Sequence, residues 1–210
     1  AFVALDADTG DVLAMVSHPG FDANEFVPQI TEERYRQIAD DPAGPLFNRA
    51  VTGEYPPGST FKPIIALAGL ESRMISEHTQ FSGPPAMDVD GRIFKNWNQN
   101  HEGILNVKYA ILRSCNTWFY QAAFRMGDRP IHEAMQHFGI GVPPAIELDT
   151  VSAGNHPDIF SSRRGLANVS IGQGALLVSP LQMAKAMGVF ATKGDSVRPR
   201  LVLQTQDALN

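Results

Sequence analysis

Apolar and polar residues at the start of the chain follow a pattern typical of two short strands. Residues 1–6 and 11–16 are apolar and β-prone, and the turn sequence Asp8-Thr9-Gly10 separates them. We therefore expect the chain to open with a β-hairpin. Residues 198–204 contain the apolar stretch Leu201-Val202-Leu203 and predict a further strand near the end of the sequence.

Helical periodicity dominates the rest of the pattern, with apolar residues three and four positions apart. The predicted helices cover residues 31–40, 59–73, 106–126, 128–139 and 179–192. Thr31 and Ser179 belong to the residue types that cap helix N-termini. Residues 76–103 carry Pro and Gly turn signals and are expected to be irregular. Together these elements predict an α+β fold that is mostly helical.

Prolines fix where the helix over residues 59–73 begins. The turn sequence Tyr55-Pro56-Pro57-Gly58 precedes Ser59, and Pro63 follows it closely. A proline is tolerated only in the first turn of a helix, where backbone amides have no partner within the helix. Ser59 is therefore expected at the helix N-terminus.

Composition narrows the class of protein. Apolar residues make up 43% of the 210 residues and charged residues 19%, which indicates a globular chain. The net charge of −5, without a basic stripe, argues against a nucleic-acid partner. No apolar stretch approaches the roughly 20 residues of a membrane span. The single cysteine, Cys115, excludes an internal disulfide.

Both ends of the sequence are informative. There is no initiator Met and no signal peptide, and strand-like sequence is present at either end. We therefore expect residues 1–210 to be a piece cut from a longer protein.

The segment Ser59-Thr60-Phe61-Lys62 places a hydroxyl and an amine on one helix face. A serine hydroxyl needs an adjacent base to act as a nucleophile, and a lysine can be that base if burial lowers its pKa. The alternative interpretation is a capping Ser and a surface Lys. The apolar neighbours Phe61 and Ile64 favour a buried helix, and the unpaired amides of the helix start favour developing negative charge.

A second polar segment, Ser114-Cys115-Asn116, lies inside the predicted helix over residues 106–126. Ser and Asn are mediocre helix formers, so their presence calls for a reason. A hydroxyl and an amide at this point could relay a proton and bind a substrate amide. The alternative is a buried helix contact in which the hydroxyl bonds to the preceding turn.

Longer segments carry a resemblance to a known family. Residues 49–63, RAVTGEYPPGSTFKP, resemble the nucleophile segment of class B penicillin-binding proteins. Residues 114–121, SCNTWFYQ, are similar to the second motif of that family, and residues 171–174 with 179–184 resemble a further segment. The opening hairpin fits the first two strands of the catalytic sheet. The resemblance spans essentially the whole chain and is strongest to the elongation-specific transpeptidases.

The resemblance implies the penicillin-binding/serine β-lactamase-like transpeptidase fold, present here incompletely as a helical region with an N-terminal hairpin. Residues 1–210 would be one truncated transpeptidase domain, and the N-terminal anchor, pedestal and C-terminal strands of the family would lie outside this chain. It also implies acyl transfer on peptidoglycan stem peptides, without a cofactor. Ser59 would attack the penultimate D-Ala carbonyl, Lys62 would take its proton, Ser114 would shuttle that proton, and Asn116 would hold Lys62 and the substrate amide. The implied substrate-binding residues are Gly172, Gln173 and Gly174.

The same resemblance implies surroundings and partners. β-Lactams would acylate Ser59 as mimics of D-Ala-D-Ala. A membrane glycosyltransferase of the elongation machinery would be a protein partner. The location would be the periplasmic face of the bacterial inner membrane.

One family motif, Lys-Thr-Gly or Lys-Ser-Gly, is absent from the sequence. Thr192-Lys193-Gly194 has a different order and lies at a predicted helix end, where Lys and Gly are common. We expect the motif, its neighbouring strands and the closing helix to follow residue 210. Without them the cleft would lack one wall and an oxyanion donor, so penicillin acylation of this isolated chain is expected to be weak or absent.

Metal binding is a separate question, because some relatives carry Cys, His and Asp ligands between the first two motifs. His101 and Cys115 are weak candidates here, and Asp88 or Asp90 could join them. Phe81-Ser82 and Asn96 stand where better ligands are expected, and a closed zinc site needs four ligands. A free buried Cys and a solvated His are favoured, so no metal is expected.

Two other functions remain open from the residues alone. A serine β-lactamase or D,D-carboxypeptidase of the same fold would need a water-activating carboxylate near Ser59, for which Glu54 and Glu147 are available. The alternative outside the enzymes is a non-catalytic penicillin sensor or an interaction module.

Overall fold

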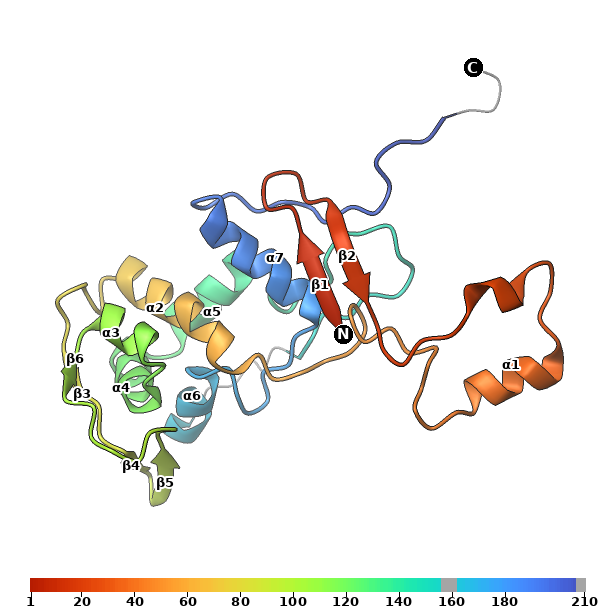
Figure 1. Cartoon of the computed structure of the whole chain (residues 1–210). Coiled ribbons are helices and arrows are strands. Elements are labelled where there is room, and N and C mark those ends of the chain that lie inside the picture. Colours follow the sequence, from red (N-terminus) through yellow and green to blue (C-terminus); the bar gives the residue numbers. More distant parts are fainter. Residues whose placement is uncertain (156–161, 207–210) are drawn as a thin grey trace. The chain divides into compact units, whose positions relative to one another are not determined.

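The structure is a computed structural model and describes residues 1–155 and 162–206. The chain divides into two compact units. The first unit comprises residues 1–54, 142–153 and 178–210, and the second comprises residues 55–141 and 154–177. Figure 1 shows their elements along the chain.

The first unit is built on the predicted hairpin, which is confirmed. Strands β1 (Phe2–Leu5) and β2 (Val12–Val16) pair antiparallel, with a register shift after Ala4. One face of the hairpin packs on a small core that lies against helix α7 (Pro180–Ala191). The residues of this core are Ala50, Val51, Ile146 and Leu181, with Val3, Leu5, Val12 and Met15 from the hairpin.

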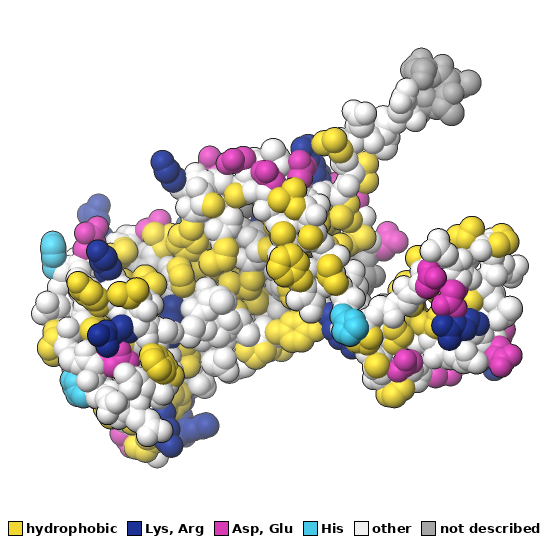
Figure 2. Space-filling model, in the orientation of Figure 1, with side chains coloured by type: hydrophobic (Ala, Val, Ile, Leu, Met, Phe, Trp, Pro, Cys, Tyr) yellow, Lys and Arg dark blue, Asp and Glu magenta, His cyan; other side chains and the backbone are white. Residues whose placement is uncertain are grey.

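The other face of the hairpin is apolar and open to solvent. Phe2 is 59% exposed, Leu13 68% and Val16 52%, and Figure 2 shows hydrophobic side chains on the surface of β1 and β2. Phe2 and Val16 lie directly opposite each other in the register. The described part of the first unit therefore leaves these side chains uncovered.

The strand predicted over residues 198–204 is wrong. Only Arg200 pairs with the hairpin there, as an isolated parallel bridge to Asp11. Its carbonyl accepts from the Val12 amide at 3.0 Å, and its own amide donates to Gly10 O at 2.9 Å. The apolar side chains that follow, Leu201 to Leu203, are exposed, so they lack the packing that would extend a strand.

Helix ends in the first unit confirm the predicted caps. A single 3-10 turn, η1 (Ala23–Phe26), precedes α1 (Glu32–Ala39), and Thr31 Oγ1 accepts from the Arg34 amide. Ser179 caps α7 in a capping box with Gln182. The segment Thr192-Lys193-Gly194 closes α7, as predicted, but Lys193 and not Gly194 takes the left-handed cap position, with a φ of 62°, and Gly194 N donates to Val189 O.

The second unit is mostly helical. Its helices are η2 (Gly58–Phe61), α2 (Lys62–Glu71), α3 (Val107–Leu112), α4 (Asn116–Met126), α5 (Arg129–His137) and α6 (Arg163–Val169). Helix α2 packs on α4 and α5, and α6 packs on α4 (Figure 1). Helix α6 was not predicted. None of the helices in the described residues is long and apolar enough to span a membrane.

Apolar side chains from α2 and α4 make up the centre of this unit. Phe61, Ile65, Trp118 and Phe119 are each 0% exposed, as the sequence pattern indicates. The apolar spacing over residues 106–126 predicts that Ile111 is buried beside them, but it is 41% exposed. The reason is that α3 and α4 are separate helices with different axes, so one periodic stripe does not run through both.

Residues 76–103 are more regular than predicted. Strands β3 (Phe81–Ser82) and β6 (Ile104–Leu105) pair antiparallel, and so do β4 (Ala86–Val89) and β5 (Arg92–Lys95). Asp90-Gly91 forms the turn between β4 and β5, with a φ of 52° at Asp90 and 79° at Gly91. Asp-Gly between short strands is a strong hairpin signal, which could have identified this element.

Candidate active site

Ser59 lies at the start of a helix, as predicted, but inside a short 3-10 turn. It is the second residue of η2, and α2 follows without interruption at Lys62. Pro63 is in the first turn of α2, where its missing N–H costs nothing. The Ser59 side chain is exposed and makes no hydrogen bond to any described residue. Ser59 is therefore open to solvent, and the structure does not join it to Lys62 or Ser114 by a hydrogen bond.

Lys62 is buried, with only 1% of its surface exposed. Its Nζ donates to Ser114 O at 2.7 Å, to Ser114 Oγ at 2.9 Å and to Asn116 Oδ1 at 2.6 Å. The Phe119 ring centroid lies 5.4 Å from the same nitrogen. The structure thus brings together three of the four predicted residues, from segments more than fifty positions apart in the sequence.

Burial lowers the pKa of Lys62 to about 8, although the nearby Cys115 and Glu102 side chains act in the opposite direction. The ordinary value for a lysine is 10.5. Roughly a tenth of Lys62 would therefore be neutral at pH 7, and only the neutral amine can accept a proton. The alternative interpretation of Lys62 as a solvated surface residue is wrong.

The long helix predicted over residues 106–126 is also wrong, because it breaks at Ser114. Ser114 has a φ of 52°, its amide donates to Ile111 O at 3.0 Å, and the Cys115 amide donates to Ala110 O at 3.0 Å. This pair of bonds is a Schellman motif, which normally has glycine at the left-handed position. The break turns the Ser114 carbonyl away from the helix ladder and toward Lys62, so that one residue offers both of its oxygens.

Asn116 is the first residue of α4, and every polar atom of its side chain has a partner. Oδ1 accepts from Lys62, and Nδ2 donates to Lys95 O at 3.3 Å. Its backbone amide, which has no partner within the helix, donates to Asn96 Oδ1 at 2.9 Å. Asn96 in turn donates to Glu102 Oε1 at 2.7 Å. Sequence reasoning missed Asn96 and Glu102, because polar residues in an irregular segment are expected to be solvated.

The Gly-Gln-Gly segment lies directly against the turn that carries Ser59. Gly58 N donates to Gly172 O at 2.8 Å. A Cβ added to Gly172, whose φ is 66°, would lie 2.2 Å from Gly58 O, so only glycine fits here. The Gln173 amide nitrogen lies 3.6 Å from where a Cβ on Gly58 would be. This contact sets the backbone position of the residue before Ser59.

The weak metal candidates are engaged in other contacts. His101 Nε2 lies 2.9 Å from Ser82 Oγ, and its Nδ1 accepts from the Gly103 amide. Cys115 is buried, with Sγ near Asn96 Nδ2 and Thr117 Oγ1. Asp88 Oδ1 accepts from the Gly91 amide within the hairpin turn. Among the described residues, no group of three or more His, Cys, Asp and Glu is arranged to hold a metal ion.

The two carboxylates considered for a water-activating role both belong to the first unit. Glu54 Oε1 accepts from Ser152 Oγ at 2.6 Å. Glu147 Oε2 accepts from the Leu201 amide at 2.8 Å, and Arg198 lies 3.8 Å from its other oxygen. Backbone hydrogen bonds, first of all from Leu201, lower the pKa of Glu147, which makes it a poorer base.

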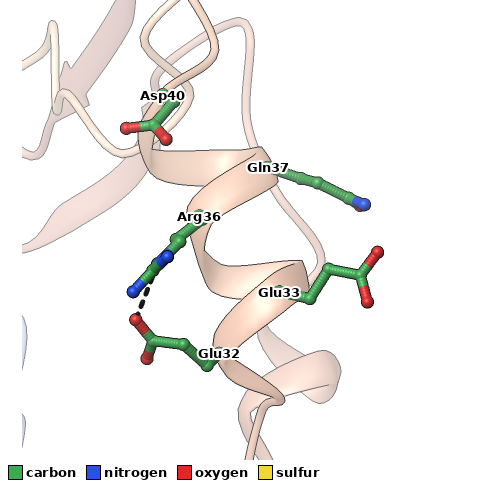
Figure 3. A pocket seen from close by; sticks show the side chains of 5 residues that line it. All are labelled: Glu32, Glu33, Arg36, Gln37 and Asp40. Atoms are coloured by element: carbon green, nitrogen blue, oxygen red, sulfur yellow. Dashed lines mark hydrogen bonds and ion pairs between the residues drawn. The ribbon is translucent and has the colours of Figure 1, made fainter.

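A surface hollow of about 580 Å³ also lies in the first unit, on α1. Figure 3 shows its lining: Glu32, Glu33, Arg36, Gln37 and Asp40. All five side chains are exposed, and Glu32 pairs with Arg36 one turn away. This is the solvated face of one polar helix, and none of its groups is placed to do acyl-transfer chemistry.

Comparison with known proteins identifies the family. A profile of the penicillin-binding protein transpeptidase domain matches residues 1–210, and the chain belongs to this family. The peptidoglycan D,D-transpeptidase MrdA of Acinetobacter baumannii is 37% identical over 99% of this chain and 33% of the relative. The chain therefore spans about a third of the length of such curated relatives.

Solved structures agree with the fold. PBP2 of Pseudomonas aeruginosa, in complex with WCK 5153, matches with a TM-score of 0.88 and 33% identity over 98% of this chain and 50% of that one. A ceftriaxone acyl-enzyme complex of penicillin-binding protein A from Mycobacterium tuberculosis gives 0.87 and 32%, over 95% and 46%. A peptidoglycan synthase complex also gives 0.87 and 32%, over 96% and 36%. The predicted α+β transpeptidase fold is thus confirmed.

Proposed function

We propose that this chain is the nucleophile-bearing part of a serine D,D-transpeptidase that cross-links peptidoglycan stem peptides during cell-wall elongation. The observation that supports this most strongly is the burial of Lys62 between Ser114 and Asn116, with a lowered pKa, three residues after an exposed Ser59. Relatives named peptidoglycan D,D-transpeptidase and an acyl-enzyme of a structural neighbour support the same reaction.

The hydrogen bonds around Lys62 define how it would handle a proton. Ser114 O and Asn116 Oδ1 can only accept, so each holds an N–H of Lys62 in either charge state. Ser114 Oγ can also donate, so it is the one contact that can face the lone pair of the neutral amine. In the proposed mechanism, the proton therefore enters and leaves Lys62 on the side of the Ser114 hydroxyl.

The proposed reaction is an acyl transfer in two stages. Ser59 Oγ forms a bond to the carbonyl carbon of the penultimate D-Ala while its proton passes to Lys62. The C–N bond to the terminal D-Ala then breaks, and the proton returns through Ser114 to the leaving amine. An amine of a neighbouring strand next attacks the ester, and its proton restores the Ser59 hydroxyl. The free Ser59 hydroxyl seen here fits an apo state, in which catalytic hydrogen bonds are often still open.

The wider assignments belong to the same proposal. Residues 1–210 would be part of a longer transpeptidase, and β-lactams would acylate Ser59. Gly172, Gln173 and Gly174 would line the substrate site, in keeping with the contact of Gly172 with Gly58. Work at the periplasmic face of the inner membrane, beside a glycosyltransferase, is supported by the similarity to PBP2 and to a peptidoglycan synthase complex.

The test is covalent labelling of the complete protein with a fluorescent penicillin, followed by mass spectrometry of the adduct. Ser59→Ala should abolish labelling, whereas Ser72→Ala, on the same helical segment with its hydroxyl bonded to Gly69 O, should label normally. A β-lactamase would release the label rapidly, and a stable adduct is expected here. Undiminished labelling of the Ser59→Ala protein would place the nucleophile elsewhere.

A further inference from the structure

Glu102 is a buried carboxylate that the proposed mechanism does not use. Its side chain is only 1% exposed, and its Oε2 has no hydrogen-bond partner among the described residues. The nearest cation, Arg113 Nη1, lies 3.7 Å from Oε2 and is itself half exposed. Burying a carboxylate oxygen without a hydrogen bond destabilises a fold, so its presence calls for an explanation.

The other oxygen of Glu102 controls which way the Asn96 amide points. Glu102 Oε1 accepts from Asn96 Nδ2 at 2.7 Å. The opposite end of that amide, Oδ1, accepts from the backbone N–H of Asn116 at 2.9 Å. A carboxylate can only accept and a backbone N–H can only donate, so the Asn96 amide has one allowed orientation.

The same logic continues to Lys62. Asn116 Nδ2 faces the Lys95 carbonyl, which can only accept, and Asn116 Oδ1 faces the Lys62 amine at 2.6 Å. Asn96 bonds to the backbone N–H of Asn116, and the side-chain amide of Asn116 bonds to Lys62, so the link from Glu102 to the proposed general base runs through the start of α4. Asn96 is only 6% exposed, and the side-chain amide of Asn116 is hydrogen-bonded at both ends.

We propose that Glu102 is a positioning residue of the active site. It orients Asn96, Asn96 holds the backbone N–H of Asn116 at the start of α4, and from there the side-chain amide of Asn116 reaches Lys62. The inference rests on the proposed function. The charged or titratable groups around Glu102 are Arg113, Lys62 and Cys115, with His101 next to it in sequence and bonded to Ser82. Glu102 does not touch the reacting atoms, so it acts only through Asn96 and through its charge.

The test exchanges the carboxylate and the amide between the two positions. Asn96→Asp alone puts two carboxylates at hydrogen-bond distance, and the saturating rate constant for β-lactam acylation should fall by roughly 10- to 100-fold, as expected when a hydrogen bond to a charged group is lost. The double variant Asn96→Asp with Glu102→Gln restores one donor facing one acceptor and should recover most of that rate. The apparent dissociation constant for the β-lactam should change little in either.

Controls separate positioning from folding. Asn100→Asp, the same substitution at an exposed position of the same loop, should leave acylation unchanged. Assays of the complete protein include a chelator, because an aspartate introduced beside Glu102 and Cys115 adds a metal-ligand type. Thermal unfolding shows which variants are folded. If Asn96→Asp does not fold, Glu102→Leu decides, because a folded Glu102→Leu protein should acylate roughly 10- to 100-fold more slowly at saturation.

The outcomes are distinct. Wild-type rates in folded Asn96→Asp or Glu102→Leu protein, or no recovery in a folded double variant, overturn the positioning role. Absence of labelling in the wild type, or labelling that survives Ser59→Ala, overturns the proposed function instead.

Discussion

Lys62 and Ser114 meet through two atoms of the same serine. Lys62 Nζ lies 2.7 Å from the Ser114 carbonyl oxygen and 2.9 Å from its hydroxyl oxygen. An ordinary helical serine could offer only its hydroxyl, because its carbonyl would be bonded four residues onward. The break between α3 and α4 is therefore what doubles the contact, and it ties the base to the backbone as well as to a side chain.

The lowered pKa of Lys62 predicts the pH dependence of acylation. The neutral amine is the active form, so the rate constant should rise with pH and level off above about 8, the pKa to which burial lowers Lys62. A solvated lysine would give the same rise near 10.5. Stopped-flow acylation of the complete protein over this range measures the midpoint. Lys62→Arg should lose acylation, while Lys108→Arg, an exposed lysine on α3, should not.

The same shift predicts how stability depends on pH. The folded-state pKa of Lys62 lies below its unfolded-state value, so the unfolded chain binds more protons between pH about 8 and 10.5. The free energy of unfolding should therefore increase as pH rises through this window. Below the window, burial of the charged Lys62 lowers the free energy of unfolding by a constant amount. Denaturant titrations of wild type and Lys62→Met measure the difference. Parallel pH profiles for the two proteins would contradict the shift.

Two substitutions at Ser114 separate backbone strain from chemistry. Ser114→Gly removes the hydroxyl and relieves a left-handed φ that costs an L-residue roughly 1–2 kcal/mol. Ser114→Ala removes the hydroxyl and keeps the strain. Both should lose most of the acylation rate, but Ser114→Gly should unfold at the higher temperature. Equal melting temperatures would show that the left-handed geometry is not strained.

Gly172→Ala should damage the site through the backbone. The new methyl group would lie 2.2 Å from Gly58 O, and the φ of 66° is unfavourable for alanine. We expect a loss of stability of at least about 1–2 kcal/mol, with slower acylation because the segment before Ser59 must move. Gly188→Ala is the matched control, since nothing lies within 4 Å of its added Cβ, and it should be neutral or stabilising. Thermal unfolding and the acylation rate constant, measured for both variants, test this prediction.

Ser179→Ala tests a helix cap that has no part in the proposed chemistry. It removes the side-chain half of the capping box with Gln182, at a position that is 0% exposed. The substitution is expected to lower the free energy of unfolding by about 1 kcal/mol, which is measured as a lower melting temperature. Ser162→Ala, which removes the equivalent cap of α6, gives an independent comparison. An unchanged melting temperature for Ser179→Ala would mean that the capping box contributes nothing measurable.

The sequence predicts the elements that local rules control. Two apolar, β-prone runs and the turn at Gly10 predict the hairpin, and Pro57 and Pro63 place the start of the helical segment at Ser59. The spacing of Ser59 and Lys62 follows from that start. These features depend on neighbours within a few residues, which a sequence displays directly.

Other parts of the site depend on contacts between distant segments. In the sequence, apolar residues keep helical spacing on both sides of Ser114, so this spacing alone cannot reveal the left-handed residue that separates α3 from α4. The burial of Glu102 and Asn96 follows from the way the strand region folds onto α4, which no local pattern encodes. The β4–β5 hairpin is a different case, since its Asp90-Gly91 turn is a local signal that is present in the sequence.

The left-handed serine also has a consequence for libraries of variants. Among variants that lack the Ser114 hydroxyl, selection for thermal resistance alone should favour glycine at position 114, where the backbone has a left-handed φ. Selection for retention of a fluorescent β-lactam should deplete the same glycine. Opposite enrichment at a single codon is the signature of a trade-off between stability and activity, and it would mark this site without any structural information.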